Sequence, residues 1–230
     1  MKALYYGLVA AAVASAATSA STQAGTLALS GIGGHYAVQV TSLKEARFKA
    51  TLRQQYDFSC GSAALATLLT HHYNYPVTEQ MVFEEMFVRG DQEKIRREGF
   101  SLLDMKSYLK AHEFQADGFA LPLSKLVESG LPAIVLIADK GYHHFVVIKG
   151  MRDGRILMGD PSTGTRAVSL ANFEASWVNK LLFVIHNKQT QAKFNAPQDW
   201  LVAPRAPLAA GLSLDSLSNV TLNKFGPGDH

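Results

Sequence analysis

The stretch that most constrains this chain runs from Arg53 to Leu69 and contains its only cysteine, Cys60. After Cys60 the sequence is apolar and rich in alanine and leucine, which favour helices. Gly61 and Ser62 suit a first helical turn, where backbone N–H groups still lack intrahelical partners. We therefore expect Cys60 at the amino end of a buried helix. The positive end of the helix dipole favours a thiolate there, and the alternative is an inert, buried cysteine.

Residues 1–24 are typical of a secretory signal peptide. Lys2 supplies a positive charge, residues 3–17 are apolar and alanine-rich, and small residues suited to cleavage follow. The apolar part is too short for a stable membrane span, and no later stretch is long and apolar enough to cross a bilayer. An uncleaved anchor is the alternative. Because exported proteins usually hold cysteines in pairs, export makes the single Cys60 a candidate working thiol.

The bulk composition predicts one folded domain. The chain has 230 residues, of which 47% are hydrophobic and 18% charged, enough for one core with tails. A net charge of +3 without a basic cluster argues against nucleic-acid binding. We divide the chain into the signal peptide, a leader segment at 25–49, a domain at 50–190, and a proline-containing, mobile or loosely docked tail at 191–230.

Hydrophobic patterning predicts early helices followed by a meandering antiparallel sheet, which is an α+β order. Thr78 is a candidate cap for a helix at Glu79–Val88, and Ser101 with Asp104 resembles a capping box. The charged stretch from Gly90 to Gly99 is interpreted as a solvated turn. Strands are expected at 131–138, which is apolar enough to be buried on both faces, and at 144–150 and 156–161.

Candidate residues for thiol chemistry are present. A thiol nucleophile needs a base, a group that orients the base, and donors for an oxyanion. His144 begins one expected strand and Asp160 ends the next, so an antiparallel hairpin brings them to the same edge of the sheet. Cys60 at a helix tip can face them. Gln54, six residues earlier, can turn its amide toward the same place and bind an oxyanion together with the Cys60 N–H.

Each candidate has a structural alternative. His144 alone can be a half-buried histidine, Asp160 a turn residue, and Gln54 a surface residue. His143 is an alternative base, which strand alternation places on the opposite face from His144. His71 and His72 are helix neighbours that do not face together, so we predict no zinc site.

Taken together, these motifs resemble peptidase family C39, the papain-like cysteine peptidases best known as leader-cutting domains of bacteriocin-exporting transporters. The resemblance runs from about Arg53 to Ile185. It implies a papain-like fold, with amino-terminal helices on an antiparallel sheet, and a thiol peptidase that needs no cofactor. It also implies roles for Cys60 as nucleophile, His144 as base and acid, Asp160 as orienter, and Gln54 in the oxyanion hole. The matching pieces are Gln54, 57–65, 99–102, 131–134, 144–147, 160–164 and 173–177.

The chain departs from the transporters in having a signal peptide and no ATPase or membrane domain, so it resembles a free-standing exported member. It is similar to the accessory peptidases of functional-amyloid secretion systems, which implies a periplasmic location. The expected partner is an exported polypeptide, with no nucleic acid and no membrane span after signal removal. Transporter members cut after paired glycines, and Gly33-Gly34 is a hypothetical self-processing site.

Two other classes of function remain open from the sequence. One is a non-cleaving peptide-binding or chaperone module on the same fold, and the other is a thiol amidase or acyltransferase.

Overall fold

The structure is a computed structural model that describes residues 25–30, 35–139 and 141–204. The predicted signal peptide and Gly33-Gly34 lie outside these residues. The chain divides after Ser42 into two units. In the first, β1 (Gly25–Ser30) and β2 (His35–Val40) form an antiparallel pair. The second unit begins with α1 (Leu43–Phe48), which the sequence had assigned to the leader segment.

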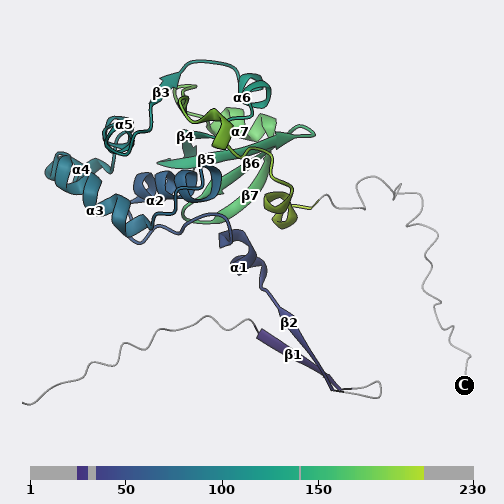
Figure 1. The fold of residues 1–230 in the computed structure, drawn as a ribbon. Coiled ribbons are helices and arrows are strands. Elements are labelled where there is room, and N and C mark those ends of the chain that lie inside the picture. Colours follow the sequence, from purple (N-terminus) through teal and green to yellow (C-terminus); the bar gives the residue numbers. More distant parts are fainter. Residues whose placement is uncertain (1–24, 31–34, 140, 205–230) are drawn as a thin grey trace, which may run out of the picture. The chain divides into compact units, whose positions relative to one another are not determined.

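The amino-terminal half of the second unit is helical (Figure 1). It contains α2 (Cys60–Thr67), a π-helical turn η1 (Leu68–His72), α3 (Glu79–Arg89), α4 (Gln92–Glu98) and α5 (Leu102–Ala111). The predicted caps are present. Thr78 Oγ1 accepts a hydrogen bond from the Met81 N–H at 3.2 Å, and Ser101 and Asp104 form a capping box.

The prediction for residues 90–99 is wrong, because most of this stretch is helix α4. Asp91 caps the helix by accepting a hydrogen bond from the Lys94 N–H at 3.1 Å. Ile95 is buried in the core, while the charged neighbours remain exposed. One buried isoleucine and a good cap therefore suffice for a short helix that packs against α3.

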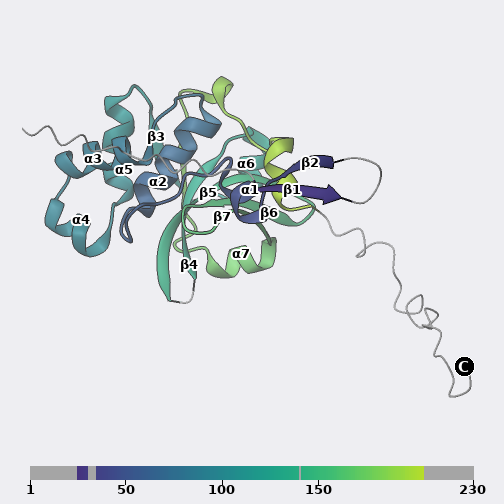
Figure 2. The same ribbon diagram turned by 90° about the horizontal axis from the view of Figure 1, so that it is seen from below.

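The other half of the unit is a six-stranded antiparallel sheet, so the α+β prediction is confirmed (Figures 1 and 2). The order is β3-β8-β4-β5-β6-β7. The strands are β3 (Ala116–Phe119), β4 (Ala133–Asp139), β5 (Tyr142–Arg152), β6 (Arg155–Asp160), β7 (Gly164–Ser169) and β8 (Leu182–Ile185). The connections include α6 (Ser124–Ser129) and α7 (Leu170–Ser176).

Each face of the sheet carries its own hydrophobic cluster. Helices α2, α3 and α5 pack with Phe145 and Val147 of β5 in one cluster. Val146 and Ile148 of the same strand pack in the other, with residues of α6 and α7. In Figure 2, α2 and α7 accordingly lie on opposite sides of the strands. Strand β4 is buried on both faces, as predicted, with Ile134 in the first cluster and Val135 in the second.

The predicted loosely docked tail is wrong for residues 191–204, which pack on the domain. The short 3-10 helix η2 (Gln189–Gln191) leads into the segment, which contains a second 3-10 helix, η3 (Pro197–Val202). The Asn195 side chain hydrogen-bonds both backbone groups of Met151, at 2.8 and 3.1 Å. Trp200 is only 2% exposed, and Arg152 stacks over its ring. The prolines interrupt the hydrophobic periodicity of this segment, but the segment still packs on the domain. Residues 205–230 lie outside the described part of the chain.

Candidate active site

Cys60 is the first residue of α2, as predicted, and is 8% exposed. All eight residues of this helix are buried. A Cβ on Gly61 would lie 2.9 Å from Met105 Cε and 3.0 Å from Phe100 Cβ. Glycine therefore allows the first turn of α2 to pack tightly under α5. The small residues after Cys60 bring the helix, and the sulfur with it, close to the sheet.

The backbone N–H groups of Phe145, Gly61 and Cys60 itself lie near the Cys60 sulfur and favour its ionised form. Burial raises the pKa of the Cys60 thiol, more than these N–H groups lower it, and the Asp160 charge acts in the same direction as burial. The expectation that the helix end holds a thiolate is therefore wrong for the resting protein. Desolvation dominates because the thiol is nearly enclosed.

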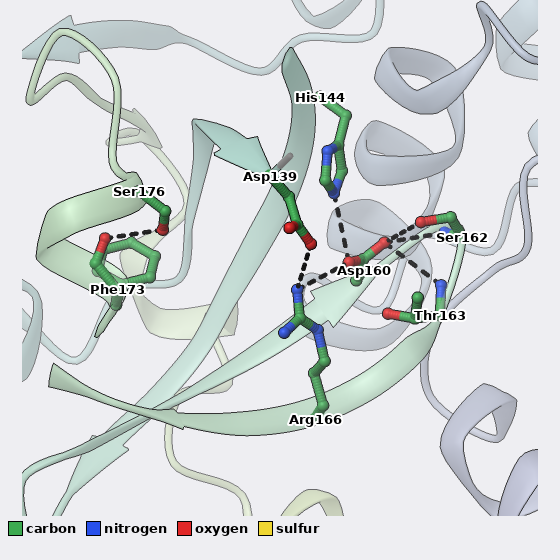
Figure 3. A network of polar contacts seen from close by, with 8 residues as sticks. All are labelled: Asp139, His144, Asp160, Ser162, Thr163, Arg166, Phe173 and Ser176. Carbon is green, nitrogen blue, oxygen red and sulfur yellow. Dashed lines mark hydrogen bonds and ion pairs between the residues drawn. The ribbon is translucent and has the colours of Figure 1, made fainter. Parts of the chain in front are cut away.

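His144 is the third residue of β5 and is 6% exposed. Its Nε2 lies 3.3 Å from Asp160 Oδ2 and donates to that carboxylate (Figure 3). Its Nδ1 is buried and has no hydrogen-bond partner among the described residues. The alternative base, His143, is exposed. Phe145, whose backbone N–H lies against the Cys60 sulfur, follows His144 directly along β5.

Asp160 ends β6, is 1% exposed, and accepts hydrogen bonds on both oxygens. Oδ1 accepts from the Ser162 N–H at 2.9 Å, the Ser162 hydroxyl at 2.6 Å and the Thr163 N–H at 3.3 Å. Burial alone would raise the pKa of Asp160, but the hydrogen bonds from His144 and Ser162 outweigh it and hold the pKa well below its usual range. The carboxylate is therefore ionised and fixed in orientation.

Sequence reasoning missed two charged residues at this site. Arg166 Nη2, from β7, lies 3.3 Å from Asp160 Oδ2 and 3.9 Å from Asp139 Oδ2 at the end of β4 (Figure 3). The contacts of Ser162 and Thr163 were accessible from the sequence, because an aspartate followed by proline and hydroxyl residues favours a side-chain-capped turn. Arg166 lies on β7, the strand that follows Asp160 in a tight hairpin, six residues along the chain.

Gln54 lies in the loop before α2. Its backbone N–H donates to the Pro161 carbonyl at 3.1 Å, which joins this loop to the turn after Asp160. The half-buried side-chain amide makes no hydrogen bond to a described residue. The structure thus brings the loop to the site, while the oxyanion role of the Gln54 amide stays a prediction.

Tyr142 ties the β4–β5 hairpin to the same loop. Its ring stacks near His144, with centroids 5.9 Å apart and an interplanar angle of 24°. Its hydroxyl donates to the Asp57 carbonyl at 2.8 Å. The tyrosine therefore couples the strand that carries the imidazole to the segment that leads into Cys60.

His71 and His72 take no part in this site. The ring of His72 hydrogen-bonds the Lys193 carbonyl at 2.7 Å, and burial lowers its pKa to about 4. It is a neutral, structural histidine that helps dock the segment after β8.

With this geometry described, the chain can be assigned to a class of enzyme. The model of the peptidase C39 family matches residues 48–189. The chain belongs to this family and is a cysteine peptidase with the predicted papain-like α+β fold. No helix in the described ranges is both long and apolar enough to cross a bilayer.

Individual relatives are similar over most of the chain. The probable functional amyloid protease FapD of Pseudomonas aeruginosa is 38% identical over 202 residues, which cover 86% of each chain. The protein of the same name from Pseudomonas fluorescens is 36% identical over 205 residues, 88% of this chain and 84% of that one. The peptidase domain of Streptococcus ComA is 20% identical, covering 59% of this chain and 97% of that domain, with a TM-score of 0.49.

Proposed function

We propose that Cys60, His144 and Asp160 are the catalytic residues of this peptidase. The observation that carries the proposal is the buried His144–Asp160 hydrogen bond, which uses Nε2 and leaves Nδ1 unpartnered beside the strand residue that contacts the sulfur. Asp160 would keep the imidazole in the tautomer that can accept a proton at Nδ1 and would stabilise the imidazolium that follows.

The raised pKa of the thiol determines how the reaction begins. Because the resting sulfur is protonated, His144 removes the thiol proton as the sulfur attacks the peptide carbonyl. The new C–S bond forms a tetrahedral oxyanion, which the Cys60 N–H and the Gln54 amide would bind. The C–N bond then breaks, and His144 protonates the departing amine. Water attacks the thioester with His144 again as base, releasing the acid and restoring the thiol.

We further propose that the substrate is an exported polypeptide of a functional-amyloid system, cut after paired glycines, in the periplasm. The two Pseudomonas relatives are named as functional amyloid proteases, which supports this partner. The predicted signal peptide supports export, and the family resemblance supports the paired-glycine preference. No cofactor enters the proposed reaction.

The proposal is tested by incubating the signal-free protein with a purified exported polypeptide of its own amyloid system. New amino termini are mapped by mass spectrometry. Cleavage should follow a Gly-Gly pair and disappear in Cys60→Ala and in His144→Gln, with circular dichroism unchanged. Replacing the second glycine by valine in the substrate should block cleavage. Full cleavage by folded Cys60→Ala would overturn the catalytic assignment, and cleavage elsewhere would overturn the specificity.

A further inference from the structure

The carboxylate that orients His144 also contacts an arginine. Asp160 Oδ2 accepts from His144 Nε2 and contacts Arg166 Nη2, both at 3.3 Å. The other oxygen is already occupied by Ser162 and Thr163. The charge that would stabilise a protonated His144 is therefore divided with a permanent cation, since a guanidinium does not deprotonate in proteins.

Arg166 is held in place by a second carboxylate. Its Nη2 lies 3.9 Å from Asp139 Oδ2, while its Nε is buried without a hydrogen-bond partner among the described residues. Among the described residues, the Arg166 side chain makes polar contacts with Asp160 at the end of β6 and with Asp139 at the end of β4. Figure 3 shows the guanidinium below both carboxylates, joined to each by a dashed line.

We propose that Arg166 is a positioning residue of this peptidase, which holds the Asp160 carboxylate and limits how strongly it stabilises the protonated form of His144. Asp139 anchors Arg166 from the far side. The inference rests on the proposed roles of Cys60, His144 and Asp160. Arg166 touches no reacting atom, so it acts only through Asp160.

Solvent screens the influence of the Arg166 charge on Asp160 without removing it. The Arg166 side chain is 29% exposed and lines a cavity of about 190 Å³ between β4, β7 and α7, together with Asp139, Asn172 and Ser176. The charged and titratable groups around His144 are Cys60 from α2, Tyr142 on β5, Asp160 from β6, and the Arg166–Asp139 pair. Arg166 is the permanent cation of this set.

The test uses the pH dependence of Cys60 alkylation by iodoacetamide, which needs no substrate. Cys60 is the only cysteine, so the rate reports one thiol. Removing the cation in Arg166→Gln should move the midpoint of the alkylation profile upward by about half to one pH unit. Arg166→Lys keeps the charge and should stay within about 0.3 unit of the wild type. Asp139→Asn removes a negative charge and should give a smaller shift in the opposite direction. Arg97→Gln, on the exposed face of α4, is the matched control and should cause no shift.

Cleavage kinetics give the second readout. With a fluorogenic peptide ending in Gly-Gly, Arg166→Gln should change kcat and the acid limb of the dependence of kcat on pH. It should leave KM unchanged. An unmoved alkylation midpoint in folded Arg166→Gln would overturn the proposal, as would a change confined to KM. If Arg166→Gln fails to fold, an upward or absent shift in Asp139→Asn overturns it instead.

A further variant separates this inference from the function on which it rests. His144→Gln should slow alkylation at neutral pH. If it does not, the catalytic assignment fails. If it does, and Arg166→Gln shows no shift, only the role of Arg166 fails.

Discussion

Replacing Asp199 by asparagine should destabilise the domain strongly, because Asp199 is the counter-ion of a buried lysine. Lys149 lies on β5, five residues after His144, and its side chain is completely buried. Its Nζ lies 3.1 Å from Asp199 Oδ2 and donates to the Ala50 carbonyl at 2.7 Å. In Asp199→Asn the ammonium keeps its hydrogen bonds to Ala50 and Thr165 but loses the carboxylate that pairs with it.

The size of the effect follows from this burial. Removing one partner of a buried ion pair costs about 3–5 kcal/mol. Because Asp199 is 11% exposed and the Ala50 carbonyl remains, we expect the lower end, about 3 kcal/mol. For a domain of this size that corresponds to a fall in Tm of roughly 6–12 °C. Urea unfolding at neutral pH, followed by tryptophan fluorescence and circular dichroism, measures this loss of stability.

The sign of the pH dependence gives a second check. Burial lowers the pKa of Lys149 below its ordinary value, although Asp199 acts in the opposite direction. Without Asp199 the pKa should fall further. A lysine with a folded-state pKa below its unfolded-state value destabilises the fold at low pH, and this cost is relieved as the pH rises through the folded-state pKa. The deficit of Asp199→Asn should therefore shrink on the alkaline side of neutrality.

Two comparisons isolate the ion pair. Lys149→Met with Asp199→Asn should recover most of the lost stability, since an apolar side chain of similar length needs no counter-ion. Glu128→Gln breaks the pair with Lys125 at 2.6 Å, a shorter contact in which both partners are more than half exposed. Its cost should stay below about 1 kcal/mol. Equal destabilisation by Glu128→Gln and Asp199→Asn, or no rescue in the double variant, would refute the reasoning.

Three further predictions follow from the site. Asp160→Asn should reduce kcat/KM by about 100-fold or more with the fold retained, because the imidazole loses its anionic partner. The folded-state pKa of Asp160 is depressed, so its contribution to stability is present above the unfolded-state pKa of about 3.9 and is lost as the pH falls from there through the folded-state pKa. Acid titration should therefore destabilise the wild type more than the variant. Gly61→Ala should cost about 1–3 kcal/mol in urea unfolding, because the new methyl group would meet Met105 at 2.9 Å; unchanged stability would show that α2 and α5 can separate freely. Tyr142→Phe removes the hydrogen bond to the Asp57 carbonyl and should cost about 1 kcal/mol with little change in the alkylation midpoint; a large midpoint shift would assign the hydroxyl a direct role at the sulfur.

Much of the site was predictable from its own neighbourhood in the chain. The helix at Cys60 follows from a run of alanine and leucine, and the capping box at Ser101 from a residue three positions later. The His144–Asp160 contact follows from a short hairpin, because consecutive antiparallel strands bring the start of one beside the end of the next. These features depend on periodicity and on hydrogen bonds between residues close in sequence.

Tertiary structure decided the remainder. The direction in which the pKa of Cys60 moves depends on how completely β5 and the helices enclose the sulfur, and no local pattern contains that. Arg166 of β7 pairs with Asp160 of β6 and reaches Asp139 of β4 only in the assembled sheet, and the segment at 191–204 is held by contacts with β5 more than 40 residues earlier in the chain. Desolvation and charge pairing are properties of the space around a side chain. That space is filled by residues distant in the sequence, so the folded chain alone determines them.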